Sequence, residues 1–175
     1  SGGDPLILPD KFLENLILSL NEIKHINTIR IHTRLPVVIP NRINPGLISW
    51  TKKCRKKLVF VFHANHPNEI NDEVRKYITK IKLKNTVLLN QSVLLKGVNN
   101  SSKVLTSLSE KLFEAGVLPY YLHLLDPIKG TSHFFVSASE GMKIIEDLKR
   151  LLPGYLVPRL AQEIPGLDSK KTFFY

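Results

Sequence analysis

Short runs of β-branched and aromatic residues alternate along this chain with longer segments of helical periodicity, and this alternation limits the fold more than any other feature. The run Leu-Val-Phe-Val-Phe at 58–62 is continuous and apolar, as in strands that are buried on both faces of a parallel sheet. Residues 28–33, 86–89 and 119–125 predict three further strands, because they too are short and rich in strand-forming residues. Parallel strands need crossover connections, so helices are expected between them.

The segments between the strands carry the apolar spacing of helices. The first helix is expected over residues 9–20, and others are expected after each strand, the last one ending before Pro153. Asparagine, aspartate and serine favour helix starts, and glycine favours helix ends. The expected caps and stops are Asp10, Asn44, Ser137 together with Glu140, and Gly116.

This order of elements predicts an α/β fold with a parallel sheet. Because crossovers between parallel strands are right-handed, the later part of a partial (β/α) barrel with outer helices is the simplest arrangement. We assign residues 1–153 to the partial barrel and residues 154–175 to an irregular C-terminal tail. The chain opens on a glycine-rich motif without a methionine, so we expect it to be a fragment whose first strands lie upstream.

Polar residues follow each predicted strand. In barrels of this kind the chemistry lies at the carboxyl ends of the strands, so these side chains are expected to converge on one face. Loops are polar in any protein, however, and convergence alone does not identify a function. The residues concerned are Arg34, His63, His66, Asn90, Gln91 and Asp126.

The charge of the chain is strongly positive. Its 25 Lys and Arg residues exceed its 15 Asp and Glu residues, which gives a net charge of +10. Such a charge attracts polyanions, but no nucleic-acid recognition motif accompanies it. The basic run at residues 52–57 lies at the end of a predicted helix, where cations are favoured by the helix dipole. We therefore interpret it as a solvated surface and do not expect nucleic-acid binding.

The single cysteine, Cys54, excludes an internal disulfide and a self-contained iron-sulfur ligand set. This composition fits a reducing cytosol, and the sequence has neither a signal-peptide pattern nor an apolar run long enough to span a membrane. The pair His63 and His66 is a poor metal site, because the sequence gives it no carboxylate partner of known geometry. We expect a cytoplasmic protein that does not contact a membrane.

Seven segments follow one another along the chain, namely SGGDPL, RIHTRLPVVIPNRI, HANHPNEI, LLNQSVLLKGVNN, PYYLHLLD, GTSHF and GYLVP. Taken together in this order, they resemble the lysine 2,3-aminomutase family, whose members are radical S-adenosylmethionine enzymes that depend on pyridoxal phosphate. The resemblance covers nearly the whole chain, and the wording RIHTRLP and GYLVPRLAQEI is most similar to the bacterial branch that supplies β-lysine for elongation factor P.

The resemblance implies a radical shift of the amino group of L-lysine from its α to its β carbon, which yields (R)-β-lysine. It also implies three cofactors, namely pyridoxal 5'-phosphate, S-adenosylmethionine and a 4Fe-4S cluster. Elongation factor P and its lysyl-transferring ligase would be the pathway partners. Lys170 falls at the position of the lysine that forms the Schiff base with pyridoxal phosphate.

The resemblance also implies roles for other residues. Gly2, Gly3 and Asp4 would line the amino and carboxylate end of S-adenosylmethionine, and His63 and Gln91 would lie near the cofactors. Arg34 would meet a phosphate or a carboxylate. The two acidic residues Asp126 and Glu163 would hold the distal ammonium of lysine, since a buried cation must be paired.

The chain departs from the family pattern in ways that leave alternatives open. The three cluster cysteines of the family, spaced C-x3-C-x2-C, would lie upstream of Ser1, so this piece alone is expected to be inactive. Glu163 replaces an aspartate of the clostridial type, and Gly166 to Ser169 replace its polyglycine. The alternatives are an aminomutase for another amino acid, such as glutamate, and an incomplete basic barrel that only binds a partner or RNA.

Overall fold

The computed structural model describes residues 3–164, 166 and 169–173. Six strands form one sheet whose order follows the sequence, β1-β2-β3-β4-β5-β6. The first five strands are parallel, and β6 runs antiparallel to β5. The strands are β1 (Thr28–Thr33), β2 (Lys57–His63), β3 (Thr86–Leu94), β4 (Leu118–Leu124), β5 (Arg159–Gln162) and β6 (Lys171–Thr172).

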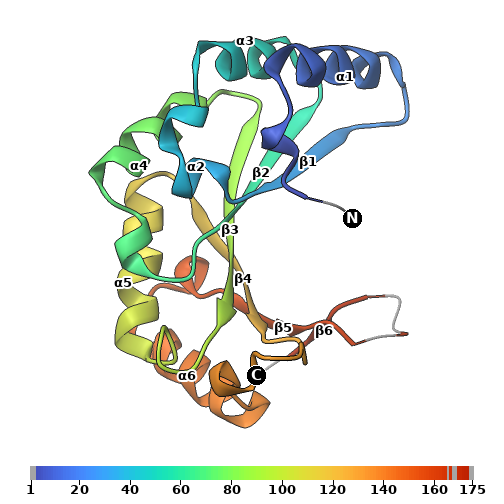
Figure 1. The fold of residues 1–175 in the computed structure, drawn as a ribbon. Helices are drawn as coiled ribbons and strands as arrows, with labels where there is room; N and C mark the ends of the chain where they lie inside the picture. The colour runs from blue at the N-terminus through green and yellow to red at the C-terminus, as the bar shows by residue number, and fades with distance from the viewer. Residues whose placement is uncertain (1–2, 165, 167–168, 174–175) are drawn as a thin grey trace.

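The helices gather on one side of the sheet, and no described helix covers its opposite side (Figure 1). A strand order that follows the sequence means that every crossover steps in the same direction, as in a barrel wall and unlike a doubly wound sheet. This arrangement confirms the predicted α/β class and partial barrel. The helices are α1 (Asp10–Glu22), α2 (Leu35–Val38), α3 (Pro45–Lys53), α4 (Asp72–Ile78), α5 (Ser102–Glu114) and α6 (Ala138–Leu151).

The core lies between the sheet and these helices. On β2 the side chains of Leu58, Phe60 and Phe62 are fully buried, and Trp50 of α3 packs among them. Its ring lies 6.4 Å from that of Phe60, measured between centroids. Because side chains alternate along a strand, the residues between these positions point to the side that the helices leave open.

Local signals in the sequence locate most helix ends. The Asn44 side chain accepts a hydrogen bond from the Leu47 amide at 2.8 Å and caps α3, and Gly116 ends the α5 segment with a φ of +77°. The expected cap at Asp10 is wrong, since Pro9 takes the cap position of α1. Asp10 instead binds Arg42 at 2.8 Å and Trp50 at 3.1 Å.

The bounds of β2, β4 and α1 differ from the prediction by one or two residues, and the larger differences concern β3 and the tail. Strand β3 continues to Leu94 instead of ending at residue 89, because Asn90, Gln91 and Ser92 belong to the ladder. The tail, which was expected to be irregular, contributes β5 and β6 to the sheet. These two strands form a hairpin that extends the sheet beyond β4, as Figure 1 shows.

In the part of the chain that the structure describes, no helix combines the length and the apolar character that crossing a membrane requires.

Candidate active site

Polar side chains form a row across the open face of the sheet. His63, Gln91, Tyr121 and Arg159 are paired in register on β2, β3, β4 and β5. Their neighbours Phe62, Asn90, Leu122 and Leu160 are buried toward the helices, so alternation places the row on the opposite face. A face without covering helices therefore carries imidazole, amide, phenol and guanidinium groups side by side.

A pocket of about 350 Å³ opens on this face. Its apolar wall includes Val93 and Ile128, and its polar residues come from β1, β3, β4 and the tail. A pocket with an apolar wall and a few converging polar groups is the usual form of a small-molecule site. The polar residues are His32, Gln91, His123, Asp126, Glu163 and Lys170.

Lys170 and Glu163 form an ion pair at the edge of the pocket. In the β5–β6 hairpin Ala161 faces Thr172 and Gln162 faces Lys171, so Glu163 and Lys170 occupy the next opposed position. The Lys170 ammonium also lies 5.9 Å from the centroid of the Tyr121 ring. The contact with Lys170 lowers the pKa of Glu163, which keeps this carboxylate charged.

Two pocket histidines are held neutral near pH 7. Burial lowers the pKa of His123, and the positive charge of Lys170 lowers it further, against the opposing charges of Glu163 and Asp126. Burial also lowers the pKa of His32, with added repulsion from Arg30 and Lys170 and an opposing hydrogen bond with Gln91. A neutral imidazole can accept a proton, so both side chains can act as bases in the pocket.

A second polar cluster lies at the ends of β1 and β2, and Asp4 anchors its first part. The Asp4 carboxylate accepts hydrogen bonds from the Thr33 hydroxyl at 2.8 Å, the Arg34 amide at 2.6 Å and the Leu35 amide at 3.1 Å. It also accepts one from the Leu6 amide at 3.0 Å and so caps the short helix η1 (Pro5–Ile7). Asp4 therefore fixes the entry loop to the carboxyl end of β1.

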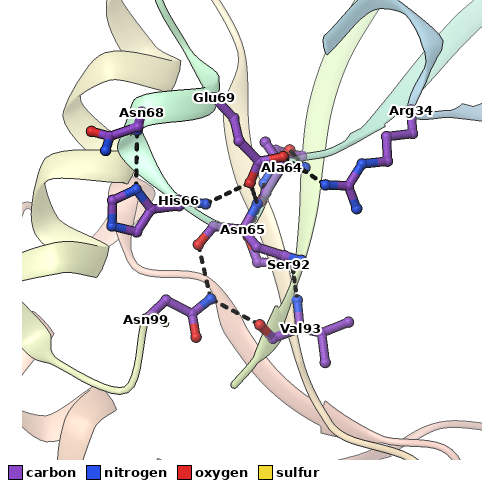
Figure 2. Close-up of polar contacts among 10 residues, drawn as sticks. Arg34, Ala64, Asn65, His66, Asn68, Glu69, Ser92, Val93 and Asn99 are labelled. Atoms are coloured by element: carbon purple, nitrogen blue, oxygen red, sulfur yellow. Dashed lines mark hydrogen bonds and ion pairs between the residues drawn. The ribbon is translucent and has the colours of Figure 1, made fainter. Parts of the chain in front are cut away.

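Arg34 and Glu69 extend this cluster to the loop after β2. The Arg34 guanidinium donates to the Glu69 carboxylate at 2.8 Å, and the other carboxylate oxygen accepts from the amides of Asn65 and His66 at 2.7 and 2.9 Å. Figure 2 shows Glu69 between Arg34 and this loop. Glu69 thus joins the ends of two strands.

His63 ends β2 beside this pair. Burial lowers its pKa, and the charge of Arg34 lowers it further, whereas the Glu69 charge and a hydrogen bond with Asn65 act in the opposite direction. Its Nε2 atom is buried and has no hydrogen-bond partner among the described residues. This nitrogen can therefore form a hydrogen bond with a ligand in the site.

Three buried asparagines hold the loops after β2 and β3 together. The Asn90 side chain donates to the Ala64 carbonyl and accepts from the Ala64 amide, both at 3.0 Å. Asn65 accepts from the Val93 amide at 2.8 Å, and Asn99 donates to the Asn65 and Val93 carbonyls at 2.8 Å (Figure 2). These bonds fix the position of the polar row, and through Val93 they also hold one wall of the pocket.

Two residues expected on the site face lie elsewhere. Asn90 points toward the helices and is 1% exposed, because β3 continues through it. His66 accepts a hydrogen bond from the Asn68 amide at 3.2 Å and caps η3 (Pro67–Glu69). Both have structural roles in the chain itself.

The other predicted site residues fall into two groups. Gln91, Asp126, Glu163 and Lys170 line one pocket, whereas Asp4, Arg34 and His63 belong to the cluster at the ends of β1 and β2. Gly3 is exposed and has open space around it. Gly2 lies outside the described residues.

Sequence reasoning missed His32 and His123 as pocket residues. His32 directly follows the buried Ile31 in β1, and His123 directly follows the buried Leu122 in β4. The apolar and β-branched residues beside them face the helices, so both histidines point to the opposite face. A period-two reading of TIRIHT and LPYYLHL would have assigned them to the open face.

The chain is similar to curated proteins over nearly all its length, while no family model matches it. It is 50% identical over 173 residues to the L-lysine 2,3-aminomutase of Haemophilus influenzae, covering 99% of the chain and 51% of that protein. It is 46% identical over 170 residues to the enzyme of that name from Escherichia coli, covering 97% of the chain and 50% of the relative. The corresponding protein of Clostridium subterminale is 41% identical over 170 residues, 97% of the chain and 41% of the relative. The chain thus spans about half the length of the curated relatives it matches.

Proposed function

Because the chain belongs to the L-lysine 2,3-aminomutase family over the part of those proteins that it spans, we propose that it forms part of an enzyme that moves the amino group of L-lysine from carbon 2 to carbon 3. The observation that carries this proposal is the pocket in which one amine, Lys170, meets two carboxylates, Asp126 and Glu163. An amine can hold an aldehyde cofactor, and carboxylates can hold the cationic end of a lysine substrate.

The pocket suits pyridoxal phosphate held by Lys170. The aromatic ring of Tyr121 lies beside the amine, and an adjoining pocket of about 290 Å³, lined by Arg30 and Ser169, supplies a cation and a hydroxyl for an anionic group. When bound, pyridoxal phosphate supplies an aldehyde for amines and a conjugated ring that delocalises electrons from the substrate. Lys170 would hold the cofactor, and the neutral His123 would accept protons released by amines in the pocket.

Asp126 and Glu163 favour lysine over acidic amino acids. Two carboxylates in one pocket attract an ammonium group and repel the side-chain carboxylate of a substrate such as glutamate. The apolar surface of Val93 and Ile128 lies along the same pocket and suits the methylene groups of lysine. The proposed substrate is therefore L-lysine.

The residues of this chain do not fit an iron-sulfur cluster. Such clusters are held by several cysteine thiolates, whereas the only cysteine, Cys54, is buried and contacts the Lys56 carbonyl. We assign no step that uses the cluster to the residues described. In the proposed enzyme, Asp4 would shape the loop near S-adenosylmethionine by the hydrogen bonds that fix it to β1.

The proposal extends to the use of the product. The wording RIHTRLP and GYLVPRLAQEI, which resembles the branch that serves elongation factor P, supports a cytoplasmic enzyme whose β-lysine is attached to that factor by its lysyl-transferring ligase. Appearance of β-lysine on elongation factor P in cells that express the protein, and its loss in cells without it, is the matching test.

Borohydride trapping tests the cofactor site directly. The full-length protein is incubated with pyridoxal phosphate, reduced and digested, and the labelled peptide is identified by mass spectrometry. We expect the label on Lys170 and its loss in Lys170→Ala, whereas Lys171→Ala, which removes the adjacent exposed lysine, should keep it. A protein that binds the cofactor without label on Lys170 would contradict the proposed site.

A further inference from the structure

The pocket contains two carboxylates, and one of them already has a cationic partner in the chain without cofactor. Glu163 forms an ion pair with Lys170. Asp126 lines the same pocket and makes no ion pair with any residue that the structure describes. Asp126 can therefore bind a cation from solution directly, whereas Glu163 must first leave Lys170.

The hairpin explains why Glu163 and Lys170 meet. Their opposed positions extend the β5–β6 pairing by one step, and the side chains of such a pair lie about 5 Å apart at Cβ. The contact is thus set by backbone pairing and does not need an incoming ligand.

We propose that Glu163 has two successive ammonium partners, namely Lys170 while its amine is free, and the distal ammonium of the substrate once Lys170 holds the cofactor. This inference rests on the function proposed above. Attachment of an aldehyde consumes the cation, because the ammonium releases a proton to solvent and its nitrogen then bonds to the aldehyde carbon with loss of water. Glu163 is then left without its partner.

The Lys170 ammonium and a substrate ammonium should compete for Glu163, because both are positively charged. One carboxylate cannot pair closely with two ammonium groups without bringing like charges together. The charge of Lys170 already lowers the pKa of both His32 and His123, so its field extends across the pocket. A second cation is disfavoured there until the Lys170 charge is removed.

The consequence is an order of binding. The chain without cofactor offers a substrate ammonium only Asp126, whereas the chain with cofactor offers both carboxylates. Glu163 thereby acts as a positioning residue for Lys170 in the chain without cofactor and as a binding residue for the substrate ammonium when lysine enters the chain with cofactor.

The test measures binding of n-pentylammonium, which imitates the distal end of lysine, to the full-length protein without cofactor by isothermal titration calorimetry. Lys170→Met removes the competing cation, and we expect it to tighten binding by about threefold to fivefold, the range of a partly exposed ion pair. Lys170→Arg keeps the cation and should bind as the natural protein does. In the double variant Lys170→Met, Glu163→Gln the gain should disappear.

Equal affinity of the Lys170→Met and Lys170→Arg variants would overturn the inference, as would a gain that persists in the double variant. Circular dichroism of each variant checks that the fold is kept. Borohydride labelling reports separately on the proposed function, so a tighter Lys170→Met variant without label on Lys170 in the natural protein would keep the competition between Lys170 and a ligand ammonium for Glu163 and reject the cofactor site.

Discussion

The Glu69 carboxylate binds the Arg34 guanidinium at 2.8 Å through one oxygen, while its other oxygen accepts the amides of Asn65 and His66. The pair joins the carboxyl ends of β1 and β2, next to His63. Its two members are unequally exposed, with 45% of the Arg34 side chain and 23% of the Glu69 side chain accessible. The loop bonds of Glu69 should therefore count for more than the ion pair.

Glu69→Ala should lower the free energy of unfolding by about 2 kcal/mol, because two loop amides lose a charged acceptor. Arg34→Met should lower it by less than about 1 kcal/mol, since partly exposed ion pairs contribute little. Urea unfolding measures both, with Glu110→Ala on the exposed side of α5 as the control. A larger loss for Arg34→Met than for Glu69→Ala would contradict this ranking.

Asn99 is fully buried and bridges the loop after β2 and the end of β3. Asn99→Ala should cost about 2 to 3 kcal/mol, because two carbonyls and the Leu95 amide lose their partner in the interior. The exposed Asn68, whose side chain is not needed for its backbone contact with His66, provides the control variant Asn68→Ala. Thermal unfolding that is equally affected by the two changes would rule out the proposed bridge.

The half-buried histidines His63 and His123 should make the fold sensitive to mild acid. The pKa of His63 and that of His123 fall below the ordinary 6.5 on folding, chiefly through burial. The unfolded chain then binds more protons below pH 6.5, so the free energy of unfolding should decrease as the pH falls from 6.5 toward the lowered pKa values. Urea titrations at several pH values measure this slope.

Replacing His63 or His123 with glutamine should reduce that slope, whereas the same change at the exposed His25 should leave it unaltered. An identical slope in all three variants would mean that other groups cause the acid sensitivity.

Asp126→Asn should weaken the use of L-lysine by the full-length enzyme. Loss of a charged partner for the substrate ammonium is expected to raise KM roughly 10-fold to 100-fold, with a smaller effect on kcat. The steady-state formation of β-lysine gives both constants. Asp147→Asn on the outer helix α6 is the control, and a KM unchanged in Asp126→Asn would remove this residue from the substrate site.

Periodicity and capping signals predicted much of the fold. The bounds of β1 were predicted to the residue, and the caps at Asn44 and Gly116 were confirmed. These features depend on local chemistry, which a sequence displays directly. The barrel-like order of the strands followed from general rules of handedness and alternation.

The errors have a common cause in longer-range contacts. Asn90 interrupts an apolar run and was interpreted as the start of a loop, but its hydrogen bonds to Ala64 keep it within β3. Strand β5 is short and follows Pro158, so its sequence carries only a weak signal for a strand. Its pairing with β4 decides its conformation. The site residues that were missed, His32 and His123, owe their positions to the face of the strand on which they lie.

The β5–β6 hairpin also makes the number of residues in its connection important for the position of Lys170. Since a shift of one residue in strand register turns every side chain to the other face, the number of residues between Glu163 and Lys170 sets whether these two side chains lie opposite each other. Insertion or deletion of a single residue there should move Lys170 away from the pocket.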